Sequence, residues 1–175
     1  MNWTSKPLAL AAALWLGSVD ANAAPAAEPR YGPCRAERVV DGNTADLQCG
    51  AEIVRVRLVH VASPQTGETG HGEASAALRA LLHGRELWIA FEIPGRPTLD
   101  SDGLLLVYLY DHAGQNMNVA LVSLGWASYA ATNGYDPLAA NFAVAEREAR
   151  AEQRAMWTVW AYTVGAGGPS DARER

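Results

Sequence analysis

The chain contains the segment Val39-Val40-Asp41-Gly42-Asn43-Thr44, followed by Val56-Arg57-Leu58 and then by Ala62-Ser63-Pro64-Gln65. Asp-Gly is a favoured hairpin turn, and threonine and valine on either side of it are typical of strands. Arg57 lies in an apolar strand, so we expect its guanidinium to be partly buried beside an acid such as Asp41 or Glu73. A structural ion pair and an anion-binding role for this arginine both remain open.

Five short β-like runs, separated by Gly, Pro and Asp turns, predict a small barrel. They cover residues 36–40, 44–48, 53–61, 86–92 and 104–110. Three helical patterns accompany them. The first begins near Glu73, the second has Asn118 as its N-cap, and the third runs from Asp136-Pro137 to Trp157. We therefore expect an α+β fold that is mainly β, with a five-stranded barrel and about three helices.

Length and composition fit one packed domain, because the chain has 175 residues of which 49% are hydrophobic and 19% are charged. Lys6, the apolar run 8–16 and the small residues Ala21-Asn22-Ala23 are typical of a secretory signal peptide. We expect four segments: a signal peptide at 1–23, a flexible leader at 24–33, the folded domain at 34–164 and a disordered tail at 165–175. The expected location is the periplasm or the outside of the cell, with no membrane span.

Cys34 and Cys49 are the two cysteines of the chain, and in an oxidising compartment such a pair most simply forms one disulfide. If Asp41-Gly42 is the two-residue turn of a hairpin, the two cysteines lie opposite each other on its strands. Closing a loop of about 15 residues contributes on the order of 3 kcal/mol in the chain-entropy model. A metal-ligating pair is disfavoured because the spacing is not CxxC.

The charge balance disfavours nucleic acid as a partner. The net charge is -5 and the isoelectric point is near 5.3, whereas affinity for phosphates usually comes with a basic face. Without Lys6 and Asp20, which lie in the expected signal peptide, 13 basic and 18 acidic residues remain and the net charge is unchanged. Only a local basic patch could override this preference.

The histidines and one acidic segment do not form recognisable metal motifs. None of the histidines lies in an HxxxH or HExxH motif, and we expect surface or turn positions for His60, His71, His83 and His112. The segment Asp100-Ser101-Asp102-Gly103 resembles the start of a calcium loop but lacks its later ligands. A β-turn is the better interpretation of that segment.

The order of strands and helices, with a set of short motifs, resembles the staphylococcal nuclease (thermonuclease) family over about residues 37–157. The motifs are Asp41-Gly42 with Thr44, Arg57-Leu58, Ser63-Pro64, Gly72-Glu73-Ala74, Tyr108, Asn118 with Leu121-Val122, Gly125-Trp126-Ala127, and Glu146 with Ala149. The resemblance implies that the barrel is an OB-fold. In active members it implies Ca²⁺ held by two carboxylates and a backbone carbonyl, a glutamate that orients water, and two arginines that hold phosphate.

The positions implied for calcium have lost most of their charge. Asp41 is retained, but Asn43 stands where the principal metal-binding aspartate is implied, and an amide brings no negative charge. Ala62 replaces the second aspartate and offers no side-chain oxygen, whereas Ser63 is a mild change from threonine. We therefore expect no bound metal and no other cofactor.

The positions implied for catalysis and nucleotide binding also lack the side chains that the resemblance implies. Gln65 replaces the glutamate, and a neutral amide cannot accept a proton from water with useful driving force. Arg57 matches the first phosphate-binding arginine, but Leu104 occupies the place of the second. The tyrosines that stack on nucleotide in the family are replaced by Asp102, Ala131 and Asn133.

These departures favour an exported thermonuclease-like domain that is catalytically inactive and acts as a binding or scaffold module for a protein or small ligand. The alternative is a divergent Ca²⁺-dependent nuclease or phosphodiesterase that hydrolyses DNA or RNA. Its metal site would be rebuilt from other acids: Asp41, Glu68, Glu73 or Asp102. A third hypothesis is a barrel that binds a sugar or peptide through its open face.

Overall fold

Five strands close into a barrel in the computed structural model, which describes residues 30–131 and 134–158. They are β1 (Tyr31–Val39), β2 (Thr44–Cys49), β3 (Glu52–Leu58), β5 (Leu87–Ala90) and β7 (Leu105–Asp111). Neighbouring strands pair in the order β3-β2-β1-β5-β7, and a parallel pairing of β3 with β7 closes the barrel. The predicted fold, mainly β with a five-stranded OB-fold barrel, is confirmed.

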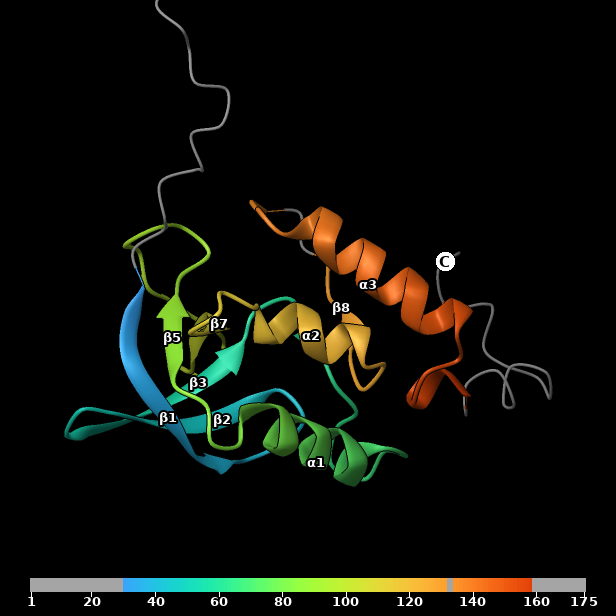
Figure 1. Ribbon diagram of the computed structural model, residues 1–175, viewed down its shortest axis with the longest axis horizontal. Coiled ribbons are helices and arrows are strands. Elements are labelled where there is room, and N and C mark those ends of the chain that lie inside the picture. The colour runs from blue at the N-terminus through green and yellow to red at the C-terminus, as the bar shows by residue number, and fades with distance from the viewer. Residues whose placement is uncertain (1–29, 132–133, 159–175) are drawn as a thin grey trace, which may run out of the picture.

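Within the described residues, three helices of seven or more residues accompany the barrel, as predicted: α1 (His71–Leu82), α2 (Met117–Ser123) and α3 (Ala139–Ala151). In Figure 1, α1 lies at the lower right of the barrel, and α2 lies between the barrel and α3. Three two-residue strands were not expected from the sequence. β4 (Val61–Ala62) pairs with β8 (Ser128–Tyr129), and β6 (Thr98–Leu99) pairs with β7.

The core lies inside the barrel and beneath the helices. Alternate side chains of the strands point inward, and α1 contributes Ala74, Leu78 and Leu82, which share one face of the helix. The larger side chains that are fully buried include Leu47, Val56, Leu78, Leu87, Val107, Leu109, Leu121 and Phe142. Their removal from water is the main force that holds the strands in this order.

The disulfide Cys34–Cys49 is present, as predicted. The prediction that a two-residue turn places the two cysteines opposite each other is wrong. A four-residue loop, 40–43, joins β1 to β2, instead of a two-residue turn at Asp41-Gly42. A β-bulge in β1 shifts the register by one residue and so compensates for the longer loop. The two cysteines are therefore opposed in the β1–β2 ladder, with their Cα atoms 4.3 Å apart.

Helix α2 begins two residues earlier than predicted, because its N-cap is Asn116 and not Asn118. The Asn116 side chain accepts a hydrogen bond from a backbone N–H of the first turn at 2.9 Å. Asn118 is fully buried; its amide donates to the carbonyls of Val59 and Val107, and its oxygen accepts the N–H of Leu109. This asparagine joins α2 to two segments of the barrel, a function that local sequence does not reveal.

Helix α3 begins later and ends earlier than the predicted span from Asp136 to Trp157. Asp136 does not cap the helix with its side chain. Its carboxylate accepts hydrogen bonds from the hydroxyls of Tyr108 at 2.9 Å and Tyr129 at 2.8 Å, and from the N–H of Leu138. Burial of the phenol, together with its hydrogen bond to Asp136, raises the pKa of Tyr129 to about 12.

His60 lies in a turn, one of the two positions expected for it, but it is buried and does not lie on the surface. The residue is 5% exposed, its Nε2 lies 2.9 Å from Glu92 Oε1, and its Nδ1 lies 3.3 Å from Ala130 O. Its φ of 60° interrupts the run expected to continue to Val61, and therefore β3 ends at Leu58.

Some predictions concern residues outside the described ranges, namely the signal peptide at 1–23, the start of the leader and the tail at 165–175. β1 begins at Tyr31, so the last three residues of the expected leader belong to a strand. Within residues 30–131 and 134–158, no helix is both long enough and apolar enough to cross a bilayer.

Candidate functional site

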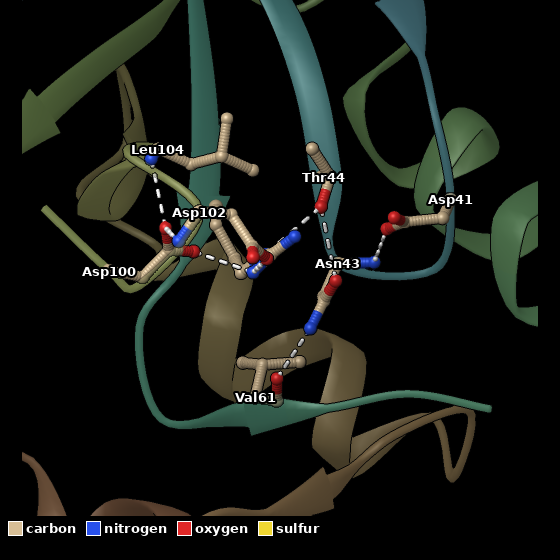
Figure 2. A network of polar contacts seen from close by, with 8 residues as sticks. Asp41, Asn43, Thr44, Val61, Asp100, Asp102 and Leu104 are labelled. Atoms are coloured by element: carbon tan, nitrogen blue, oxygen red, sulfur yellow. Dashed lines mark hydrogen bonds and ion pairs between the residues drawn. The ribbon is translucent and has the colours of Figure 1, made fainter. Parts of the chain in front are cut away.

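The segments singled out in the sequence meet at one end of the barrel (Figure 2). Loop 40–43 precedes β2, Arg57 lies near the end of β3, and loop 100–104 precedes β7. Because β3 pairs antiparallel with β2 and parallel with β7, Arg57 lies beside Thr44 on one side and Leu106 on the other. The topology of the barrel therefore gathers positions that are distant in sequence.

Loop 40–43 is shaped by Gly42 and Asp41. An added Cβ on Gly42 would lie 2.6 Å from Ser63 Cβ and 2.9 Å from Ala74 Cβ, so this close approach requires glycine. The partly buried Asp41 accepts the N–H of Asn43 through Oδ1 at 2.9 Å, which makes an Asx turn. The retained aspartate thus holds the shape of its own loop.

Asn43 is integrated into the hydrogen bonds of the protein. The residue is 8% exposed; Nδ2 donates to Val61 O at 2.8 Å, and Oδ1 accepts from the Thr44 hydroxyl at 3.2 Å. Thr44 Oγ1 in turn accepts from Arg57 Nε at 3.4 Å. An amide supplies the donor and the acceptor that this position needs, whereas a carboxylate would face Val61 O with no hydrogen to donate.

Ala62, Ser63 and Gln65 follow along the chain at and after β4. Ala62 is exposed, and Ser63 is buried with its backbone carbonyl accepting from Gln65 Nε2 at 2.9 Å. The N–H of Gln65 donates to Glu68 Oε2 at 2.7 Å. The Gln65 amide is therefore a donor to its own chain, which is the opposite of the acceptor function implied for a glutamate at this position.

Arg57 pairs with Asp100 and Asp102, and the expected partners Asp41 and Glu73 are wrong. Arg57 Nη1 lies 2.5 Å from Asp100 Oδ2 and 3.0 Å from Asp102 Oδ2. The Arg57 side chain is 28% exposed, and two carboxylates exceed its single positive charge. The two acids therefore offset the positive charge that would attract a phosphate group to this guanidinium.

Loop 100–104 forms the predicted β-turn, in which the N–H of Gly103 donates to Asp100 O at 3.1 Å. Asp100 Oδ1 also accepts the N–H groups of Asp102 and Leu104, each at 2.8 Å (Figure 2). Leu104, at the position implied for a second arginine, is half-buried and brings no charge. The turn therefore places two aspartates beside Arg57, at a place where the resemblance implies a second arginine.

The oxygen atoms of this site do not fit Ca²⁺, which takes about six to eight oxygen ligands in protein sites. Ala62 supplies no side-chain oxygen, and oxygens of Asp41, Asn43 and Ser63 accept hydrogen bonds from protein donors. In the part of the chain that the structure describes, no group of three or more His, Cys, Asp or Glu side chains is arranged to hold a metal ion.

The positions implied for nucleotide stacking carry no aromatic ring. Asp102 pairs with Arg57, and Ala131 is exposed, while Asn133 lies outside the described residues. The roles assigned to these positions and to the substituted ligands stay predictions. What the geometry establishes is that the polar side chains of Asp41, Asn43, Arg57 and Gln65 each have a partner within the fold, whereas the buried hydroxyl of Ser63 has none.

Known proteins are similar to this chain in sequence. The family described as "Staphylococcal nuclease homologue" matches residues 55–159. The chain belongs to this family. The nuclease homologue is 26% identical to a protein named "Uncharacterized endonuclease" in Escherichia coli O157:H7. The match spans 124 residues, which are 71% of this chain and 76% of that protein. A protein of the same name in Escherichia coli has the same identity and coverage.

The matched range of this nuclease homologue includes Arg57, Ala62 and Gln65 but begins after Asp41 and Asn43. β1 and β2 complete the barrel, and the loop between them carries those two residues to the end of the barrel where Thr44 pairs with Arg57. The candidate site is therefore assembled from matched and unmatched parts of the chain.

Sequence reasoning missed Asp100 and Asp102 as the partners of Arg57. They lie 43 and 45 residues away along the chain, and the β3–β7 pairing alone makes them neighbours. One signal was available: a partly buried arginine requires an acid, and these two acids precede a strand of the same barrel.

Proposed function

We propose that this nuclease homologue is catalytically inactive and acts as an exported binding or scaffold module for a protein or small ligand. The observation that carries the proposal is the ion pairing of Arg57 with Asp100 and Asp102. The one retained phosphate-binding arginine is neutralised by its own chain. A site whose arginine is already paired lacks the charge needed to stabilise a phosphoryl transition state.

The surroundings of Asn43 and Gln65 support the same proposal. Both side-chain amides donate to backbone carbonyls, those of Val61 and Ser63, so neither is poised to accept a proton from water. We further propose that the domain binds no catalytic Ca²⁺, since the implied ligands are neutral or already hydrogen-bonded. Nucleic acid is disfavoured as the ligand because the chain has a net charge of -5.

Export is supported by the disulfide between Cys34 and Cys49, because such bonds persist mainly in oxidising compartments. The signal-peptide pattern at 1–23 supports the same location, either the periplasm or the outside of the cell. A disulfide-linked hairpin also suits a module that must stay folded without a metal.

The alternative is a divergent Ca²⁺-dependent nuclease, which the name of the Escherichia coli relatives favours. Three of the four candidate acids for a rebuilt site already have a partner. Asp41 accepts from its own loop, Glu68 accepts from Gln65, and Asp102 pairs with Arg57. Calcium binding would have to break these contacts, and only Glu73 is without one among the contacts described above.

The test is incubation of the purified mature protein with single-stranded DNA and RNA, with and without Ca²⁺, beside an Arg57→Ala variant. We expect no cleavage and no thermal stabilisation by Ca²⁺. Saturation at 100-fold above the dissociation constant would add about 2.7 kcal/mol to stability, which a melting experiment detects readily. Calcium-dependent cleavage that disappears in the Arg57 variant would show a working nuclease.

A gain-of-function experiment tests the frame itself. The combined variant Asn43→Asp, Ala62→Asp, Gln65→Glu and Leu104→Arg restores the implied charges. Adding Asp100→Asn and Asp102→Asn removes the two carboxylates that form ion pairs with Arg57. We expect Ca²⁺-dependent cleavage to require both sets of changes, because the first set leaves the phosphate position blocked.

A further inference from the structure

A pocket beside the degenerate site carries a negative charge. Its volume is about 320 Å³. Its lining combines the polar residues Ser63, Glu68, Thr69 and Ser128 with the apolar residues Ala62, Pro64 and Met156. Among these described residues, Glu68 is the one with a charged side chain, so the lining offers nothing to neutralise a phosphate or carboxylate.

Glu68 is held in position by one hydrogen bond, and its second carboxylate oxygen can accept another. Its Oε2 accepts the backbone N–H of Gln65 at 2.7 Å, which orients the carboxylate and leaves Oε1 for another donor. The residue is exposed, so a ligand can reach it from solvent. A carboxylate in this state attracts a cation that also donates hydrogen bonds.

The remaining lining suits a long side chain with a charged tip. Thr69 and Ser128 carry hydroxyl groups that accept hydrogen bonds, while Ala62, Pro64 and Met156 provide apolar contact. Lysine combines an apolar four-carbon stem with an ammonium group that has three donors, and it commonly buries the stem while the charge finds acceptors. The substitution at Ala62 matters here, because an aspartate at that position would replace part of the apolar wall.

We propose that this pocket binds a lysine side chain presented by a basic peptide segment of a partner. The proposal rests on the proposed binding role of the domain and names the chemistry of its ligand. The net charge of -5 would steer a cationic segment toward the protein, and the neutralised Arg57 offers no competing repulsion.

The experiment measures binding of hexalysine to the purified mature chain by titration calorimetry at low salt. Fully Nε-acetylated hexalysine is the matched neutral probe. We expect Glu68→Gln to weaken hexalysine binding about fivefold, as for loss of one partly exposed charge-assisted hydrogen bond. The control is Glu52→Gln, the same charge change at an exposed residue that begins β3, where we expect less than a twofold effect.

Two results would overturn the lysine pocket: equal weakening by Glu68→Gln and Glu52→Gln, or equal binding of the acetylated peptide. A second variant, Ala62→Lys, places a tethered ammonium at the pocket wall and should abolish binding, since position 62 is exposed and tolerates a longer side chain. Unchanged binding in that variant also contradicts the proposal. Calcium-dependent cleavage would instead overturn the proposed function, so the two failures are distinguishable.

Discussion

Replacing Asn43 with the aspartate implied by the family should destabilise this protein. The Asn43 amide donates to Val61 O at 2.8 Å in a place that is 8% exposed. In Asn43→Asp, a carboxylate oxygen would face that carbonyl, and neither oxygen can donate. The hydrogen bond from the Thr44 hydroxyl at 3.2 Å can survive, because a carboxylate still accepts it.

The size of the effect follows from these contacts. Leaving one buried acceptor without its donor costs about 1–3 kcal/mol. The Asp41 carboxylate, which accepts the N–H of residue 43 at 2.9 Å, adds repulsion between like charges. We therefore expect Asn43→Asp to lower the free energy of unfolding by about 2 kcal/mol at pH 7 without metal, near the middle of that range.

The assay is urea unfolding of the parent, Asn43→Asp and Asn43→Ala at pH 7 and pH 4.5. Protonation of the new carboxyl restores a donor toward Val61 O, so the penalty in Asn43→Asp is present at the higher pH and is reduced as the pH falls. Asn43→Ala has no group to protonate, and its penalty should not depend on pH. Ca²⁺ should not rescue Asn43→Asp, since Ala62 still supplies no ligand.

If Asn43→Asp were as stable as the parent at pH 7, the reasoning would be refuted. Such a result would mean that the contact with Val61 contributes little and that position 43 is free to hold a metal ligand. Recovery of stability in millimolar Ca²⁺ would argue in the same direction and would favour the divergent nuclease.

Further predictions concern stability. Hydrogen bonding to Arg55 is the largest cause that lowers the pKa of Asp46 to about 2, so Asp46 stabilises the fold above about pH 4 and loses this effect as the pH falls toward 2. Asp46→Asn should cost about 1–2 kcal/mol at pH 7 and flatten acid unfolding between those values; unchanged acid unfolding would contradict this. Serine at both Cys34 and Cys49 should cost about 3 kcal/mol in chemical unfolding, and a cost below about 1 kcal/mol would contradict the loop-closure account. Asn118→Ala should cost about 2–4 kcal/mol, because three buried backbone groups lose their partner, and a melting temperature equal to that of the parent would disprove it.

Much of the barrel could be predicted because its signals are local. Runs of β-branched and apolar residues between turn formers indicate strands whatever surrounds them, and α1 shows its buried face through the spacing of Ala74, Leu78 and Leu82. The cysteine pairing could also be predicted, since two cysteines permit one intramolecular bond. The predicted two-residue turn was wrong, but the cysteines are still opposed because a loop of four residues and a β-bulge compensate for each other.

Asn118 and His60 show where local signals fail. Asparagine near a helix start usually indicates a cap, yet Asn118 makes its hydrogen bonds to the barrel. A lone histidine after a strand usually indicates a surface turn, yet His60 is buried against Glu92. Both polar side chains are buried because distant segments supply their partners, and no window of sequence contains those segments.

The residue types alone establish that Asn43, Ala62, Gln65 and Leu104 bring no charge in any fold. That they stand in place of three carboxylates and one arginine is what the family resemblance implies. The partners of the charged residue Arg57, in contrast, depend on the tertiary structure. Arg57 meets Asp100 and Asp102 because β3 and β7 run parallel and adjacent, and strand adjacency between residues 43 and 45 positions apart depends on closure of the whole barrel.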